Sequence, residues 1–262
     1  MSQNKAERVV WLDTVRVLAM LMVIFMHAPI PGRNLESSPI LGLLSYLTFP
    51  CIGLFFMASG ALLLPVKMDY REFMKRRFSR ILFPTIIWSL FYIAVKFYFK
   101  EIDLSGVLKL ILHIPFGAVE GVLWFMYTLA GLYLFAPFLS KWLEFAPKRE
   151  LEYFLMFWLI VMGFPFLNAF VKLPQNDYHI LSTFSGFMGY MILGFYLRKF
   201  PVNLGSLKNI ISFGLTIVIF SVLLPAIFYL VPIEGFDPGT VLYNYLSVNI
   251  VVMSAGWFIL IQ

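Results

Sequence analysis

Long stretches of apolar residues dominate the chain, and the polar residues gather in the short segments between them. A helix needs about 20 mostly apolar residues to cross a bilayer. By that criterion we predict about eight transmembrane helices, over residues 10–29, 41–64, 81–99, 121–139, 151–170, 183–198, 209–231 and 240–261. The runs are too long and continuous for the alternating strands of a transmembrane barrel. The pattern therefore predicts an all-α fold, a polytopic transmembrane helical bundle that forms one membrane domain over residues 1–262.

One apolar stretch does not fit this criterion. Residues 104–118, LSGVLKLILHIPFGA, are too few to span a bilayer and include Pro115 and Gly117. We expect an interfacial or re-entrant segment there.

Composition and charge agree with a membrane protein. The chain is 61% hydrophobic and 13% charged, whereas soluble domains are about half apolar and a quarter charged. Most Lys and Arg residues lie in the segments that face the cytoplasm if the N-terminus does, so we predict a cytoplasmic N-terminus and no nucleic-acid partner. Cys51 is the one cysteine, which excludes an internal disulfide, and no His or Cys spacing resembles a metal site.

The first apolar stretch, WLDTVRVLAMLMVIFMHAP, contains Asp13, Arg16 and His27. On a helix Arg16 and His27 lie about 20° apart and Asp13 about 60° from Arg16, so the three share one stripe. Ionisable residues inside a membrane are rare and indicate a functional interior. We predict that Asp13 pairs with Arg16 and that His27 is catalytic. The alternatives are an Arg16 that snorkels to the cytoplasmic interface and a His27 near the outer interface that is hydrogen-bonded to a loop carbonyl.

The loop KMDYREFMKRRFSRILFP, residues 67–84, is strongly basic. Positive-inside topology with contact to anionic lipids explains much of this charge. On a helix, however, Arg77 and Arg80 share a face and could grip phosphates from the cytosolic side. Both interpretations remain open.

Two further sets of residues have alternative interpretations. Ser59 and Gly60 are small residues inside a span, and close helix packing is the usual reason for such residues. Glu120 precedes a span at its outer end, and Trp124 and Tyr127 follow it. The two aromatic residues fit an interfacial belt or the wall of a sugar site, and we predict that the three contact substrate.

The order and spacing of these motifs resemble the membrane acyltransferase-3 family. The resemblance rests on LDTVRVLAMLMVIFMHA, GLFFMASGALLL and RRFSRILFP, and it covers nearly the whole chain. The segments LWFMYTLAGLYLFAP and FSGFMGYMILGFYL are similar to the branch that includes the enterobacterial common antigen O-acetyltransferase. The family's Arg and His of the first span fall on Arg16 and His27, its Arg-x-x-Arg motif on Arg77 and Arg80, and its small-residue motif on Ser59 and Gly60.

The resemblance implies an enzyme of the bacterial inner membrane that transfers an acyl group, most often acetyl from acetyl-CoA, to a hydroxyl of a surface or lipid-linked saccharide. It implies acyl-CoA as co-substrate, with no permanently bound cofactor. Arg16, Arg77, Arg80, Ser59 and Gly60 would serve the donor, and His27 would be the general base, with Asp13 holding Arg16.

The sequence departs from the family in two ways. Val122 stands where many members have a histidine, and the family's last helix, with its Ile-Tyr-Leu-x-His pattern, is absent. Because members have about ten spans, we expect the bundle to be completed beyond Gln262. A saccharide or anion transporter or flippase is the main alternative function, and a membrane sensor is a third.

Overall fold

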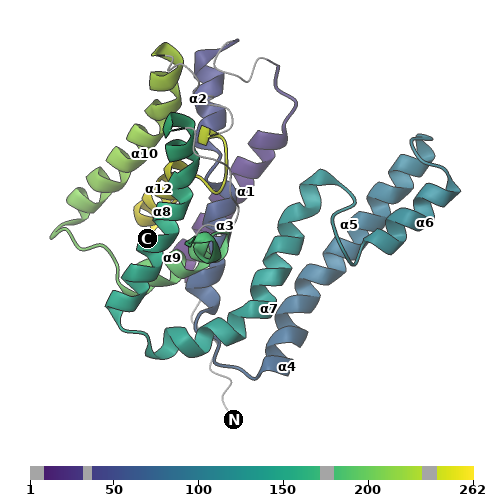
Figure 1. Cartoon of the computed structure of the whole chain (residues 1–262), viewed down its shortest axis with the longest axis horizontal. Helices are drawn as coiled ribbons and strands as arrows, with labels where there is room; N and C mark the ends of the chain where they lie inside the picture. Colours follow the sequence, from purple (N-terminus) through teal and green to yellow (C-terminus); the bar gives the residue numbers. More distant parts are fainter. Residues whose placement is uncertain (1–8, 32–36, 172–179, 232–240) are drawn as a thin grey trace. The chain divides into compact units, whose positions relative to one another are not determined.

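The protein is described by a computed structural model, which places residues 9–31, 37–171, 180–231 and 241–262. Every regular element in these ranges is a helix (Figure 1). The chain packs into two compact units. The larger unit combines Met1–Leu62 with Pro147–Gln262, and the smaller unit is Leu63–Ala146.

Six helices in the described ranges are long and apolar enough to cross a membrane. They are Val10–His27, Pro39–Leu63, Tyr70–Tyr98, Gly121–Phe145, Lys148–Asn168 and Leu207–Leu230. This confirms the predicted all-α, polytopic membrane fold.

The other two predicted spans fold as shorter helices. The span predicted over 183–198 is α9, Met188–Lys199, of 12 residues. Gly186 precedes it with a φ of +95°, which interrupts the helix. The span predicted over 240–261 is α12, Val248–Ile261, of 14 residues, because the backbone of Ser247 is extended. At 1.5 Å per residue these helices are about 18 and 21 Å long, short of a full crossing.

The larger unit is built around α3, Cys51–Leu63. Among its described residues, this unit also contains α1 (Val10–His27), α2 (Pro39–Leu47), α8 (Lys148–Val171), α9, α10 (Leu207–Leu230) and α12, with a short helix η3 (Ser182–Phe184) before α9. Ten residues of α3 are buried, from Cys51 to Ala61 with Phe55 as the exception. Helix α3 is therefore the core helix of this unit.

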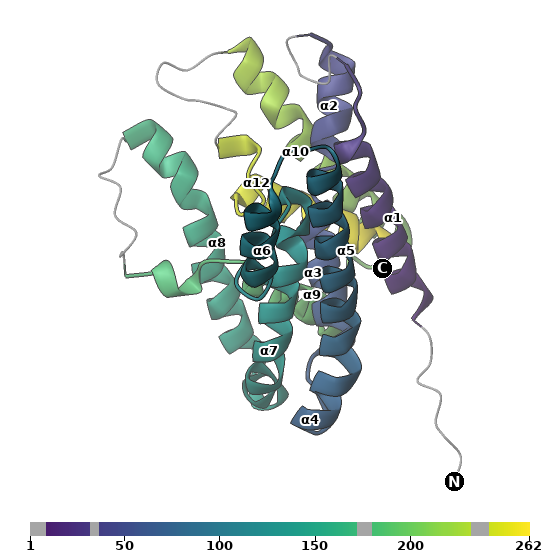
Figure 2. The ribbon, with the colours of Figure 1, turned by 90° about the vertical axis from the view of Figure 1, so that its right-hand side faces the viewer.

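The smaller unit is a pair of long helices with a short one beside them (Figure 2). Its first rod runs continuously through α4 (Tyr70–Phe73), the π-helix η1 (Met74–Phe78) and α5 (Ser79–Tyr98). Helix α6 (Leu104–His113) packs against α5, and the chain returns through η2 (Gly121–Leu123) and α7 (Trp124–Phe145). Helix α6 has ten residues and none of them is buried, so it matches the prediction of a segment too short to span.

Candidate functional site

Helix α1 presents two different faces. Leu12, Val15, Ala19 and Met22 recur at spacings of three and four and are its buried residues. The stripe of Asp13, Arg16 and His27 lies about 100° round the helix from that packed face. The Asp13 and Arg16 side chains are each about one-third exposed and His27 is exposed, so part of this polar stripe is accessible.

The expected ion pair forms at the first turn of α1. The Arg16 Nη1 and the Asp13 Oδ1 lie 3.6 Å apart, and both side chains are about one-third exposed. At that distance and exposure the pair adds little stability. Its effect is instead to hold the guanidinium of Arg16 on the stripe.

The His27 imidazole lies exposed at the last turn of α1. Its Nδ1 lies 2.9 Å from the backbone oxygen of Val23, one turn earlier. A carbonyl oxygen only accepts hydrogen bonds, so in the neutral ring the proton resides on Nδ1. The lone pair is then on Nε2, which can accept a proton. The backbone thus fixes the tautomer that in many enzymes is fixed by a carboxylate, and this contact is local rather than to a loop.

A polar cluster that the sequence analysis missed lies next to the His27 end of α1. The Tyr245 hydroxyl donates to the Met26 sulfur at 3.1 Å, and the Tyr190 hydroxyl donates to the Tyr245 carbonyl at 2.6 Å. The Asn249 amide nitrogen donates to the Leu242 carbonyl at 2.9 Å and to the Tyr46 hydroxyl. The run VLYNYLSVNI, residues 241–250, is the signal, since its polar residues interrupt an apolar stretch.

The basic segment of the smaller unit contains the π-helix. Arg77 lies in η1 and is half-buried, and Arg80 follows in the first turn of α5 and is exposed. Arg76 pairs with Glu72 on the preceding turn. π-Helical turns are rare and occur often at functional sites. The two arginines predicted to bind phosphate thus flank the point where the helical register changes.

The structure favours the packing interpretation of Gly60 over a role in donor binding, which stays a prediction. A Cβ on Gly60 would lie 1.9 Å from the Met191 backbone oxygen, and one on Gly194 would lie 2.0 Å from the Met57 backbone oxygen. The backbones of α3 and α9 therefore touch, and Gly60 has no room for a side chain. Ser59 is only 7% exposed, and packing explains this small-residue motif.

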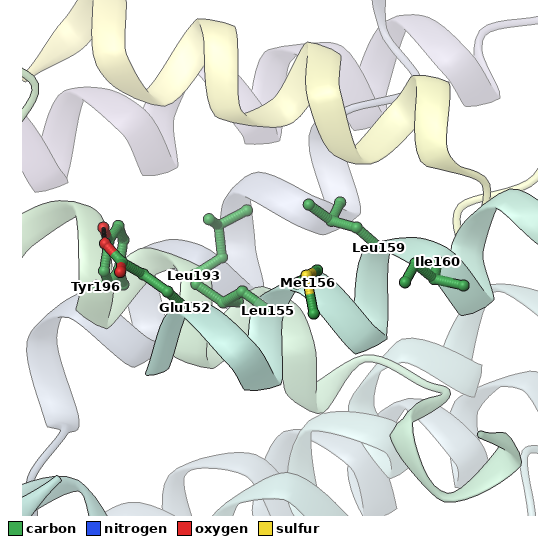
Figure 3. A pocket seen from close by; sticks show the side chains of 7 residues that line it. All are labelled: Glu152, Leu155, Met156, Leu159, Ile160, Leu193 and Tyr196. Atoms are coloured by element: carbon green, nitrogen blue, oxygen red, sulfur yellow. Dashed lines mark hydrogen bonds between the residues drawn. The ribbon is translucent and has the colours of Figure 1, made fainter. Parts of the chain in front are cut away.

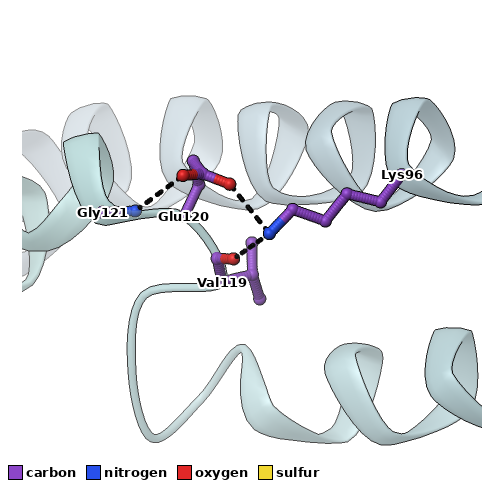
Figure 4. Close-up of polar contacts among 4 residues, drawn as sticks. All are labelled: Lys96, Val119, Glu120 and Gly121. Carbon is purple, nitrogen blue, oxygen red and sulfur yellow. Dashed lines mark hydrogen bonds and ion pairs between the residues drawn. The ribbon is translucent and has the colours of Figure 1, made fainter. Parts of the chain in front are cut away.

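The residues predicted to bind substrate lie at the other end of the smaller unit. The Glu120 carboxylate lies 2.8 Å from the Lys96 Nζ and also accepts from the Gly121 backbone N–H at 3.2 Å (Figure 4). The Lys96 ammonium also donates to the Val119 carbonyl at 3.3 Å. The hydrogen bond from Lys96, followed by that from Gly121, lowers the pKa of the Glu120 carboxyl. Glu120 therefore fastens the start of α7 to α5.

The two aromatic residues after Glu120, Trp124 and Tyr127, make different contacts. The Tyr127 hydroxyl donates to the Ile114 carbonyl at 2.6 Å, and its ring packs in the cluster around Ile93, Val119 and Leu123. Trp124 is half-buried at the start of α7. The Tyr127 contacts fit a structural role, and the Trp124 ring packs edge-to-face with Phe125, with 6.4 Å between the ring centroids.

Three of the cavities in the described part of the chain differ in the side chains that line them. A groove of about 520 Å³ runs between α8 and α9, and its lining is aliphatic except for Glu152 and Tyr196 at one end (Figure 3). There the Tyr196 hydroxyl donates to Glu152 at 2.8 Å. A second cavity, of about 340 Å³, lies between α5 and α7 beside Trp88 and Phe125. A third, of about 390 Å³, lies at the end of the smaller unit that carries α4 and has a mixed polar and aromatic lining.

The comparison with family models decides the class of protein. A model described as an acyltransferase domain matches residues 9–262. The chain belongs to the acyltransferase-3 family. Together with its six candidate spans, this membership makes it an acyltransferase of the multi-pass membrane type. Neither the search of curated proteins nor the search of solved structures found a match. The similarity to the enterobacterial common antigen branch stays a prediction.

The site residues predicted for this acyltransferase divide between the two units. Asp13, Arg16 and His27 belong to the larger unit, and Arg77 and Arg80 belong to the smaller one. Within the described ranges no three His, Cys, Asp or Glu side chains gather in a way that could hold a metal ion.

Proposed function

We propose that this acyltransferase moves an acyl group, in the first place acetyl from acetyl-CoA, to a hydroxyl of a cell-surface or lipid-linked saccharide. The membrane is the bacterial inner membrane, and the N-terminus is cytoplasmic. The observation that carries the proposal is the His27 ring, because its Nδ1 contact with Val23 leaves Nε2 as the basic nitrogen on the open stripe of α1.

In the proposed reaction His27 acts as general base. Its Nε2 takes the proton from the acceptor hydroxyl while the hydroxyl oxygen attacks the thioester carbonyl. The tetrahedral intermediate expels the CoA thiolate, which takes the proton from the imidazolium to give CoA and the new ester. An acyl-histidine intermediate is a second route through the same nitrogen.

The donor is held by arginine side chains in this proposal. Arg77 and Arg80 bind the phosphates of the acyl-CoA from the cytosolic side, since guanidinium groups form strong charge-assisted hydrogen bonds to phosphate. Arg16, held by Asp13, stays a predicted contact of the acyl-CoA. The acceptor approaches from outside, with Trp124 offering an aromatic face to a sugar ring.

The decisive experiment compares two histidines of the chain. The full-length protein is expressed in a bacterial host that lacks it, as wild type, His27→Ala or His113→Ala, and the surface glycans are weighed by mass spectrometry. His113 is exposed on α6 and serves as the matched control. Wild type and His113→Ala should add the mass of one acetyl group and His27→Ala should not, at equal amounts of protein in the membrane.

A second experiment distinguishes acyl transfer from transport of the substrate. A transporter or flippase would move its substrate without releasing CoA from acetyl-CoA. Purified acyltransferase in membrane vesicles should release CoA only when the acceptor extract is added. Acceptor transport with no CoA release would contradict the proposal and favour the transporter.

A further inference from the structure

The cavity at the α4 end of the smaller unit is framed by two segments far apart in sequence. The segment Val66–Tyr70 forms one side, and the last turns of α7 form the other. The Ser140 hydroxyl accepts from the Val66 N–H at 2.8 Å and donates to the Ala136 carbonyl at 2.6 Å, which ties the two sides together. The volume of this cavity, about 390 Å³, falls within the ~300–1,000 Å³ typical of small-molecule sites.

One wall of this cavity is aromatic. The Tyr70 and Phe138 rings lie 5.9 Å apart between centroids and are tilted by 56°. The two residues are 43% and 59% exposed, so their faces are not consumed by packing. Exposed aromatic faces beside a cavity suit a flat aromatic ligand, and base stacking of this kind is worth about 1–3 kcal/mol.

The rim of the cavity carries three charged side chains, those of Asp69, Lys141 and Glu144. Asp69 is already used in part, because its Oδ2 accepts from the Arg71 N–H at 3.0 Å. Glu144 and Lys141 lie one turn apart on α7, both exposed, and neither has an ion-pair or hydrogen-bond partner among the described residues. A carboxylate only accepts, so a ligand at Glu144 must offer N–H or O–H groups.

The arginines that are predicted to bind phosphate lie at this same end of the unit. The helix η1, which contains Arg77, packs against α7, and α4 and the end of α7 lie at the same end of the unit in both views (Figure 2). A ligand that fits both places has a flat base with an amino group, joined to phosphates. The two carboxylates of the rim, Asp69 and Glu144, outnumber its one cation, Lys141, which disfavours the alternative of an anionic lipid headgroup in the cavity itself, since like charges repel.

We propose that this cavity binds the adenine base of the acyl-CoA donor. The base stacks on Tyr70 and Phe138, and its 6-amino group donates to the Glu144 carboxylate. The inference rests on the proposed function, because it takes acyl-CoA as the donor. It adds a specific claim that the proposed function does not need, namely that the protein binds the adenine base as well as the phosphates of the donor.

The test uses CoA itself and an analogue in which hypoxanthine replaces adenine, so that an oxygen stands in place of the amino group. Equilibrium dialysis with the full-length protein in detergent micelles gives the Kd of each. Wild type should bind CoA about tenfold more tightly than the analogue, the ratio expected for one hydrogen bond to a charged group. Glu144→Ala should lose that preference by weakening CoA binding alone. Equal Kd values for both ligands in wild type would overturn the proposal.

The aromatic wall has a matched control on the same helix. Phe138→Ala should weaken both ligands by about tenfold, the loss expected when one stacking face is removed. Phe145 is 82% exposed and does not line the cavity, so Phe145→Ala should bind as wild type does. Equal affinities in Phe138→Ala and Phe145→Ala would remove adenine from this cavity.

Failure of this inference differs from failure of the proposed function. If CoA binding depends on Arg77 and Arg80 but CoA and the hypoxanthine analogue bind equally well, only the adenine site is contradicted. No binding of CoA in any form would overturn the donor assignment and the adenine site together.

Discussion

Helices α1 and α3 lie in the same unit but are packed in different ways. In the apolar window of Pro39–Leu63, which contains α3, 61% of residues are buried, against 22% for Val10–His27. Small residues let α3 touch α9 through the backbone, whereas α1 packs through a single narrow face. A helix enclosed on all sides has no surface left for a substrate. A helix packed on one face keeps another on which polar side chains can act.

The smaller unit shows a similar contrast between its two ends. At one end the Lys96–Glu120 pair and the Tyr127–Ile114 hydrogen bond fasten α5, α6 and α7 together. At the other end an exposed Arg80 and an open cavity lie beside the π-helix. The fastened end fits a structural role, and the open end fits ligand binding.

The largest effect is expected at the contact between α3 and α9. Gly60→Ala should destabilise the protein by about 3 kcal/mol or more, because the new methyl group would overlap the Met191 backbone, which cannot rotate away. Thermal unfolding in detergent measures the loss. Gly163→Ala on α8, where a Cβ would meet nothing within 4 Å, is the control and should be neutral or slightly stabilising. A Gly60→Ala protein as stable as the control would break the contrast between α3 and α1.

Substitutions at the open end of the smaller unit should change the affinity for CoA rather than the stability of the fold. Replacing both Arg77 and Arg80 by Ala should raise the Kd for CoA by about 100-fold, from the loss of two charge-assisted contacts. Lys109→Ala, an exposed cation on α6, should leave that Kd unchanged. If the double variant lost stability and kept its affinity, the basic segment would serve topology alone.

Two neighbouring residues of α1 separate its packed face from its polar stripe. Ala19 is fully buried and Met20 is 50% exposed. Ala19→Leu should cost about 1–3 kcal/mol through overpacking, while Met20→Leu should cost less than about 1 kcal/mol. Both are read from unfolding midpoints in the same detergent. Equal costs would mean that α1 is enclosed on the side of His27 as well.

The smallest effect is expected from the ion pair of the fastened end. Glu120→Gln should lower stability at pH 7 by less than about 1 kcal/mol, since the pair is about one-third exposed. The pKa of the Glu120 carboxyl is lowered in the folded protein, so the contribution is present at neutral pH and is lost as the pH falls through that lowered pKa. The difference in stability between wild type and variant should therefore fade as the pH falls below that lowered pKa. A difference that persisted in acid would assign the effect to packing instead of charge.

Much of the fold could be predicted from hydrophobic patterning, and less of the site could. The long apolar runs predicted the six helices that are long enough to span, and the spacing of Asp13 and Arg16 predicted their ion pair. Patterning overestimated the spans predicted over 183–198 and 240–261, because their helices begin only after Gly186 and Ser247.

Contacts between distant residues are what sequence reasoning missed. The sequence allowed both a packing and a binding role for Gly60, and the proximity of the Met191 backbone favours packing. The pairing of Glu120 with Lys96 spans 24 positions of the chain, 96 to 120, and no local pattern encodes it. The same holds for the cavity that Tyr70 and Phe138 line together.

The central claim is that the Nε2 of His27 accepts the acceptor proton, and one measurement tests it most directly. Acetyl transfer from labelled acetyl-CoA to the acceptor extract is followed in membrane vesicles that hold equal amounts of wild type, His27→Ala or His113→Ala. The account predicts loss of at least about 100-fold in rate for His27→Ala, the usual contribution of a general base, and no loss for His113→Ala. Transfer by His27→Ala at the wild-type rate would contradict it.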